Sequence, residues 1–156
     1  MPKKIIVSVL VAIFVIASGV AGLRSCAQKF WGDTLHGPYL GRDYTNTIPD
    51  KPSSTLAVPE KATIEIYEIE NSNNPVLVTR GGNGQVISRV QLIPEQKDSK
   101  GQIQTTFIKN LELRSVKRGR DGYKVFFSCF WGWGSKEGGI IYLNTDLSFK
   151  EMSISW

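Results

Sequence analysis

The sequence predicts an all-β domain, and three observations on its last 94 residues carry this prediction. From Thr63 to Trp156 there is no alanine, the residue that most favours a helix. The same residues include 32 of Val, Ile, Phe, Tyr, Trp and Thr, which favour the pleated surface of a strand. The prolines in this part, Pro75 and Pro94, fall at the edges of apolar runs, where a strand tolerates them.

Apolar runs of strand length alternate here with clusters of Gly, Asn, Asp and Ser, which is the pattern of short strands joined by turns. Asn83-Gly84 and Asp121-Gly122 are hairpin signals, and Asn144-Thr145-Asp146 is typical of a short hairpin as well. Strands joined by short turns pair antiparallel. We therefore expect a small antiparallel meander, a sandwich or a partly closed barrel of seven or eight strands, preceded by one N-terminal hydrophobic helix. The expected strands are 62–69, 75–80, 85–93, 102–108, 110–116, 123–131, 139–143 and 147–155.

Residues 24–61 show no sustained period of a strand or a helix, and Pro38, Pro49, Pro52 and Pro59 interrupt them. We interpret them as a Pro/Gly-containing linker, which places the β domain at 62–156. Aromatic and leucine side chains are frequent within 30–44. They indicate packing against the β domain or contact with a membrane surface, or alternatively a recognition segment.

The N-terminus predicts a membrane or export signal. Residues 5–23 are a stretch of 19 uncharged residues directly after Lys3 and Lys4. As a helix, this stretch would span roughly 28 Å, close to the hydrocarbon core of a bilayer. It is either a signal anchor or a signal peptide cleaved near the small residues at 17–22. Both interpretations place the β domain outside the cytoplasm: bound to the bacterial inner membrane and facing the periplasm, or secreted.

Charge and composition exclude several classes of protein. The net charge of +5 falls to +3 once the two N-terminal lysines are set aside, which argues against a nucleic-acid partner. Two cysteines exclude a disulfide-dense scaffold, and one histidine excludes most metal-based catalysis. The sequence has no phosphate-binding loop opening a helix and no zinc-ligand spacing, so we expect no cofactor and no metal.

The two cysteines lie in different surroundings. Cys26 lies just beyond the apolar stretch, where it is a candidate for lipidation or for a disulfide to Cys129 or to a partner chain. Cys129 lies among phenylalanines in an expected strand, and a thiol buried in apolar surroundings is inert.

Trp131 and Trp133 alternate with glycines at the end of the expected strand 123–131. Tryptophan beside glycine can stack on a sugar ring or bury itself in a partner protein. The alternative is that these tryptophans close the open end of a small barrel. Along the same strand apolar residues fall on both faces, which indicates a strand covered on both sides or one face exposed for binding.

A second candidate binding site is a basic turn. Its five cations oppose only Asp121 and can hold a phosphate, an anionic lipid head group or an acidic polysaccharide. The alternative is a solvated turn whose charges only keep the protein soluble. The residues of the basic turn are Arg114, Lys117, Arg118, Arg120 and Lys124.

These features favour an envelope protein whose β domain binds a protein partner or an anionic lipid or glycan without catalysis. One alternative is a structural subunit of a larger membrane complex, with residues 5–23 as its span. Another is a small cofactor-free hydrolase working with carboxylates such as Glu65, Glu68 and Glu70, although these are typical of charges on a solvent-facing side.

Mass spectrometry of the mature N-terminus decides between the two interpretations of residues 5–23. A signal anchor leaves Met1 in place, and an intact Met1 would contradict cleavage. A signal peptidase leaves a chain that starts near Val20 or Leu23, and such a start would contradict the anchor.

Overall fold

The computed structural model describes residues 35–97, 102–131 and 135–155. The chain divides into the units Met1–Thr34 and Leu35–Trp156, and only the second contains described residues. These residues form twelve strands and one short 3-10 helix, η1 (Pro59–Lys61). The prediction of an antiparallel all-β domain is confirmed. The expected N-terminal helix lies outside the described residues.

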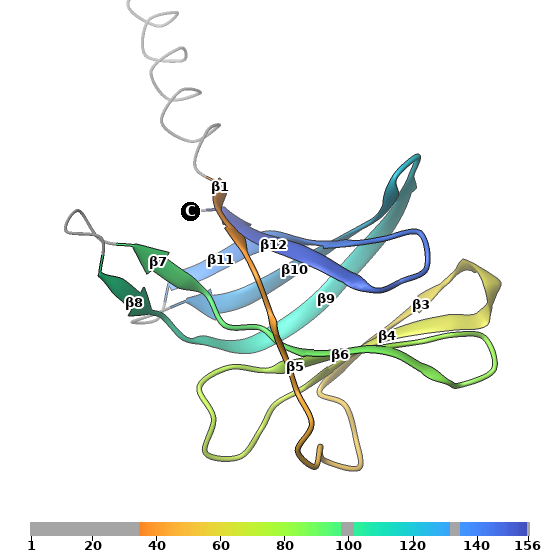
Figure 1. Cartoon of the computed structure of the whole chain (residues 1–156), viewed down its shortest axis with the longest axis horizontal. Coiled ribbons are helices and arrows are strands. Elements are labelled where there is room, and N and C mark those ends of the chain that lie inside the picture. Colours follow the sequence, from red (N-terminus) through yellow and green to blue (C-terminus); the bar gives the residue numbers. More distant parts are fainter. Residues whose placement is uncertain (1–34, 98–101, 132–134, 156) are drawn as a thin grey trace, which may run out of the picture. The chain divides into compact units, whose positions relative to one another are not determined.

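The strands form two five-stranded antiparallel sheets and a two-stranded one (Figure 1). Sheet A has the order β1-β12-β11-β10-β9 and sheet B the order β2-β6-β5-β4-β3. Sheet A contains β1 (Leu35–Tyr39), β9 (Ile108–Gly119), β10 (Gly122–Trp131), β11 (Ser135–Leu143) and β12 (Phe149–Ser155). Sheet B contains β2 (Arg42–Asp43), β3 (Ser54–Val58), β4 (Ala62–Tyr67), β5 (Val76–Arg80) and β6 (Val86–Gln91). The small sheet pairs β7 (Glu95–Lys97) with β8 (Ile103–Thr105).

Each large sheet is a meander of four consecutive strands completed by one strand from the start of the domain. β1 pairs with β12, and β2 pairs with β6, so one short run of chain adds an edge strand to both sheets (Figure 1). A Cβ atom at Gly41, between β1 and β2, would overlap Cγ1 of Val90. The chain therefore passes from one sheet to the other along a path that leaves no room for a side chain at residue 41.

Residues 35–58, expected to belong to the linker, form β1, β2 and β3. Together with β7, which the sequence does not predict either, they bring the described residues to twelve strands in place of the expected seven or eight. The prolines do not prevent this pairing because of where they lie. Pro49 and Pro52 precede β3 and Pro59 follows it. Pro38 lies within β1, but β1 is an edge strand, and its register shifts between His36 and Tyr39. Edge strands and irregular positions are where a sheet accepts proline.

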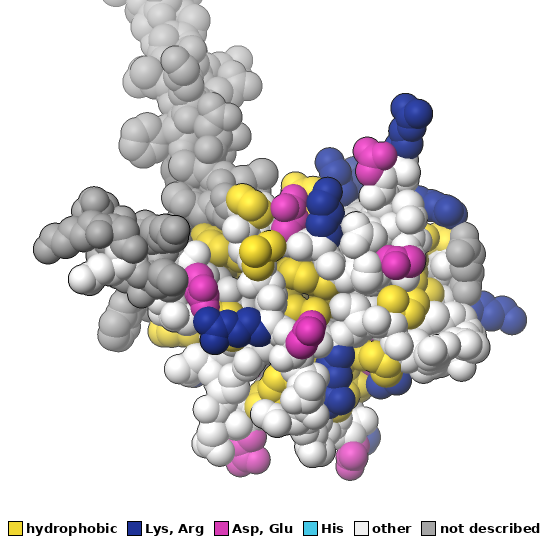
Figure 2. Space-filling model, viewed as in Figure 1, with side chains coloured by type: hydrophobic (Ala, Val, Ile, Leu, Met, Phe, Trp, Pro, Cys, Tyr) yellow, Lys and Arg dark blue, Asp and Glu magenta, His cyan; other side chains and the backbone are white. Residues whose placement is uncertain are grey.

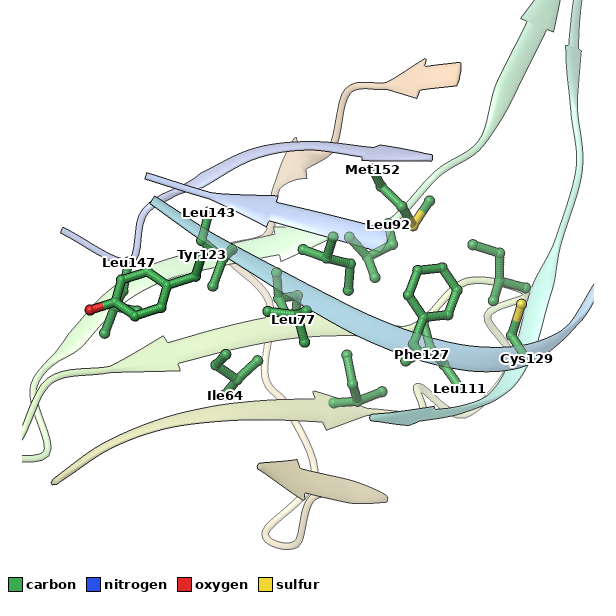
Figure 3. Packing of buried hydrophobic residues seen from close by; sticks show 14 of the residues in the cluster. Ile64, Leu77, Leu92, Leu111, Tyr123, Phe127, Cys129, Leu143, Leu147 and Met152 are labelled. Carbon is green, nitrogen blue, oxygen red and sulfur yellow. The ribbon is translucent and has the colours of Figure 1, made fainter. Parts of the chain in front are cut away.

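One hydrophobic core joins the two large sheets. Every second residue of β10 points into it, namely Tyr123, Val125, Phe127 and Cys129, and all four are buried. From sheet B, Ile64 and Leu77 enter the same core and are fully buried (Figure 3). Burial of each large apolar side chain contributes about 1.5–3 kcal/mol to folding. The expected strand at 123–131 is confirmed as β10.

A second, smaller cluster lies on the other face of sheet B. Tyr67, Val76 and Val78 are buried there, and Tyr44 and Ile48 from the segment after β2 pack against them. The side chains of β4 and β5 are thus covered on both faces. This explains why four of the five residues of β5 are buried.

Hydrogen bonds also connect the two sheets. The hydroxyl of Thr79, the one buried polar side chain among the described residues, donates to the carbonyl oxygen of Leu147 over 2.9 Å. The amide of Leu113 in β9 donates to Oγ of Ser54 in β3 over 3.0 Å. Each such bond contributes about 1 kcal/mol to the free energy of unfolding. The bond at Thr79 also gives a buried hydroxyl an acceptor, without which it would destabilise the fold.

Cys129 is a free and buried thiol, 1% exposed. Burial raises its pKa to about 12, and the charge of Glu137 acts in the same direction. The reactive thiolate is therefore scarce at neutral pH. Cys26 lies outside the described residues.

Glu65 is the centre of a polar network on the outer side of sheet B. Its carboxylate accepts hydrogen bonds from the hydroxyl of Tyr67 over 2.7 Å, from Nε of Arg80 over 3.0 Å and from the hydroxyl of Thr63 over 3.2 Å. Its side chain is 13% exposed, so Glu65 is not the solvent-facing charge that the sequence favours. Burial alone would raise its pKa, but the hydrogen bonds and the Arg80 charge together hold the pKa below its ordinary value of 4.5.

Replacing this carboxylate tests its contribution to stability. Because the folded-state pKa is lowered, the ionised group stabilises the fold at neutral pH, and this contribution is lost as the pH falls from 4.5 through the folded-state pKa. We expect Glu65→Gln to lower the free energy of unfolding in urea by about 1–2 kcal/mol near pH 7, and by much less at about pH 3.

The matched control is Glu112→Gln. Glu112 pairs with Arg114 at 2.5 Å, but both side chains are more than half exposed, so the effect is expected to stay below about 0.5 kcal/mol. An equal loss for Glu65→Gln at both pH values would contradict the role given to its charge.

Candidate functional site

The β9–β10 hairpin ends in a tight turn, one residue earlier in the chain than the Asp121-Gly122 signal predicts. Gly119 pairs with Gly122, which leaves Arg120 and Asp121 as the turn residues. Gly122 has a φ of 136°, which L-residues rarely adopt, and a Cβ atom there would overlap the carbonyl oxygen of Leu143 in β11. The turn thus depends on glycine at position 122, both for its backbone conformation and for its contact with the neighbouring strand.

The pairing register divides the five residues of the basic turn. Lys117 lies directly opposite Lys124, and both are exposed on the outer face of sheet A. Arg118 lies opposite the core residue Tyr123, with its guanidinium carbon 5.8 Å from the centre of the ring. Arg120 is exposed in the turn. Of the five residues of the basic turn, Lys117 and Lys124 therefore lie together on one face, and Arg120 lies next to them in the turn.

Arg114 is held further along the hairpin. Its Nε donates to the hydroxyl of Ser128 over 2.9 Å, and its guanidinium pairs with Glu112. It still lies on the outer face of sheet A, because Ser128 alternates with the buried residues of β10. Its charge is partly offset by Glu112.

A hollow of about 380 Å³ lies beside the turn. Three cations line it, Arg120, Lys124 and Lys150, together with the carboxylates of Asp121 and Glu151. Lys150 and Glu151, both from β12, are not among the residues predicted from the sequence. The sequence feature that indicates these two residues is the hairpin at 144–146, because it pairs β12 with β11. Glu151 then lies opposite Tyr142, and Tyr142 lies opposite Lys124 of β10. The remaining lining residues are Gly119, Gly122, Tyr123, Tyr142 and Leu143.

Aromatic rings accompany the lysines on this face. The Lys117 amine lies 5.4 Å from the centre of the Phe126 ring, and the Lys124 amine lies 5.8 Å from that of Tyr142. Phe130, two residues beyond Ser128, is 40% exposed. The register places Lys109 on one side of Phe130 and Lys136 on the other. Each aromatic ring thus has a lysine beside it.

We call this surface the basic face of sheet A. It comprises Lys109, Arg114, Lys117, Lys124, Lys136, Phe126, Phe130, Ile140 and Tyr142. Figure 2 shows Lys and Arg side chains gathered at the upper right, over the tip of β9 and β10. Like charges directly opposite each other in a sheet destabilise it, and neither Lys117 nor Lys124 has an ion pair with a described residue. An anion that bridged the two amines would relieve their repulsion.

The tryptophan site predicted from the sequence stays a prediction. Trp131 ends β10, where its backbone pairs with Ser135 and Ile108. Trp133 lies outside the described residues. A strand of ten residues spans about 30 Å, so the end of β10 at Trp131 is far from the turn at Gly122. The structure therefore does not bring Trp131 and the basic turn into one site.

Comparison of the chain with protein-family models, with curated proteins and with solved structures found no match. Among the described residues, no group of three His, Cys, Asp or Glu side chains is placed to hold a metal ion. No helix within residues 35–97, 102–131 and 135–155 is long and apolar enough to cross a membrane, and residues 5–23 lie outside these ranges.

The two glycines of the turn allow a matched test of its geometry. Gly122→Ala places a methyl group against the Leu143 carbonyl and strains a positive φ, so we expect a loss of about 2 kcal/mol or more in the free energy of unfolding. Gly119→Ala meets only an ordinary contact, 3.6 Å from the carbonyl oxygen of Gly122, and we expect a change below about 1 kcal/mol. Equal stability of the two variants in urea would contradict the turn described here.

Proposed function

We propose that the chain is a membrane-anchored or exported envelope protein whose β domain binds an anionic partner without catalysing a reaction. The observation that carries the proposal is the cross-strand pair of Lys117 and Lys124. Two lysines placed opposite each other in the register cost stability in the free protein, and that cost is recovered when a phosphate, sulfate or carboxylate group binds both amines. Arg120 and Lys150, which line the adjoining hollow, add further donors.

The hollow suits recognition of one charged group on a larger partner. Its volume of about 380 Å³ is at the small end of ligand sites, and its lining combines cations with the ring of Tyr142. Asp121 and Glu151 in the same lining restrict where an anion can lie, because their carboxylates repel it. Such a mixture of charges favours selective, salt-dependent binding of a charged group.

The apolar stretch 5–23 supports a location outside the cytoplasm for the β domain. The anionic components available there are lipid head groups and acidic glycans. Nucleic acid is disfavoured by the same location and by the small net charge of the chain outside its N-terminal lysines.

A binding assay with a defined probe tests the proposal. Full-length protein in neutral detergent is passed over immobilised heparin, a sulfated polysaccharide, and its affinity is measured against increasing NaCl. We expect Lys117→Gln with Lys124→Gln to weaken binding about tenfold, because two charge-assisted contacts are lost. Binding of the unchanged protein should weaken steadily with salt.

The matched control removes the same charge elsewhere, with Lys51→Gln and Lys61→Gln, which flank β3 of sheet B. We expect this variant to bind like the unchanged protein. If both double variants lost affinity equally, binding would follow net charge alone and the basic face would have no special role. Binding that did not respond to salt would contradict an anionic partner altogether.

A further inference from the structure

We infer that the anionic partner is the lipid surface of the membrane, and that the β domain lies on it with the basic face of sheet A. This inference rests on the proposed function and names its ligand. It draws on the charge of the face, its aromatic residues, the contrast with sheet B and the length of chain between residues 5–23 and β1.

The charge of the face is complementary to anionic lipid. By register, the outward residues of β9, β10, β11 and β12 include five cations, the four lysines and Arg114 of the basic face. The carboxylates among them are Glu112, next to Arg114, and Glu151, at the hollow. The lysines lie on three different strands, β9, β10 and β11, and a spread of separate cations suits a surface of many head groups better than a single small anion.

The apolar residues of the face match the interfacial zone of a bilayer. Phe130 is 40% exposed, and Phe126, Ile140 and Tyr142 are half-buried. They alternate with the core residues of β10 and β11 and belong to neither buried cluster of the described residues. Aromatic rings between lysines can enter the head-group region while the amines reach the phosphates above them.

The outer side of sheet B has a different character. Tyr44 and Ile48 cover part of it, and Arg80 there is paired with Glu65. Arg42, on the edge strand β2, is paired with Glu95. Arg80 and Arg42 are thus neutralised within the domain, and Arg89 of β6 donates to the carbonyl oxygen of Asn46 and lies over the Tyr44 ring. Lys117 and Lys124, in contrast, have no carboxylate partner among the described residues. The two faces of the domain therefore differ in their expected attraction to anionic lipid.

The tether to the apolar stretch is short and attaches to the same sheet. Eleven residues, 24–34, separate residue 23 from Leu35, the first residue of β1, and β1 is the edge strand of sheet A. Fully extended, such a segment reaches at most about 40 Å. With residues 5–23 in a bilayer, the domain cannot leave the surface by more than this. The resulting effective concentration of lipid is high, and contacts too weak to recruit a free domain suffice to orient a tethered one.

A fluorescent label on each side of the domain tests this orientation in the full chain. Cys26→Ser leaves Cys129, which is buried and does not react, so a newly placed cysteine is labelled alone. Ser153→Cys places the environment-sensitive dye NBD on the basic face, opposite Ile140. Thr55→Cys places it on the exposed outer side of β3 in sheet B. Both proteins are inserted into nanodiscs of phosphatidylcholine with or without about one-third phosphatidylglycerol.

We expect NBD at position 153 to brighten, and to be shielded from the soluble quencher dithionite, only in the anionic discs. Label at position 55 should respond alike in both. About 0.5 M NaCl should reverse the change at position 153. Lys117→Gln with Lys124→Gln should reduce the lipid-bound population about 25-fold relative to the unbound one, since each lysine near an anionic surface contributes about fivefold.

Three outcomes would overturn the inference: no difference between the discs at position 153, an equal response at position 55, or a chain that does not enter the discs. The heparin assay separates these from a failure of the proposed function. If Lys117 and Lys124 mattered for heparin but position 153 did not respond to lipid, the domain would bind an anionic glycan, and the lipid assignment alone would be wrong. If neither assay responded to the two lysines, the proposed function itself would fail.

Discussion

The two-residue period of β10 is the constraint on which the rest of the structure depends. Tyr123, Val125, Phe127 and Cys129 all point into the core shared by the two large sheets. A shift of the strand by one residue would bury Lys124 and expose Phe127, so the core determines the register. The outward direction of Lys124, Phe126 and Phe130 is thus a consequence of folding, and the basic face follows from the same alternation that makes the core.

The two sheets use this core differently. Sheet B is buried on both sides over β4 and β5, because residues 44–48 fold back on its outer side. Sheet A contributes one side to the core and presents the other with lysines, serines and half-buried rings. β1 and β2 complete both sheets and, with Gly41 between them, connect the start of the domain to each. The domain therefore has one side partly covered by its own chain and one side that presents lysines and half-buried rings, and the proposed function rests on this difference.

Much of the fold was predictable because its signals are local. The eight expected strands coincide with β4, β5, β6, β8, β9, β10, β11 and β12, since alternation and turn residues act over a few positions. The strands β1 to β3 were not predictable in the same way. They lie among prolines, and only their pairing with β12, β6 and β4 makes them strands. For the site, local clustering identified Lys117, Arg120 and Lys124, but the contribution of Lys150 depends on two successive pairings, of β10 with β11 and of β11 with β12.

Chemical-shift mapping by NMR tests the central claim most directly, because it reports every residue of the domain at once. Isotope-labelled full-length protein would be compared in bicelles of zwitterionic lipid and in bicelles containing anionic lipid. We expect the largest shifts on the outward residues of β9, β10 and β11, with Lys117, Lys124 and Phe126 foremost, and no change at Val78 and Thr55 of sheet B. Shifts centred on sheet B, or no difference between the two lipids, would contradict this claim.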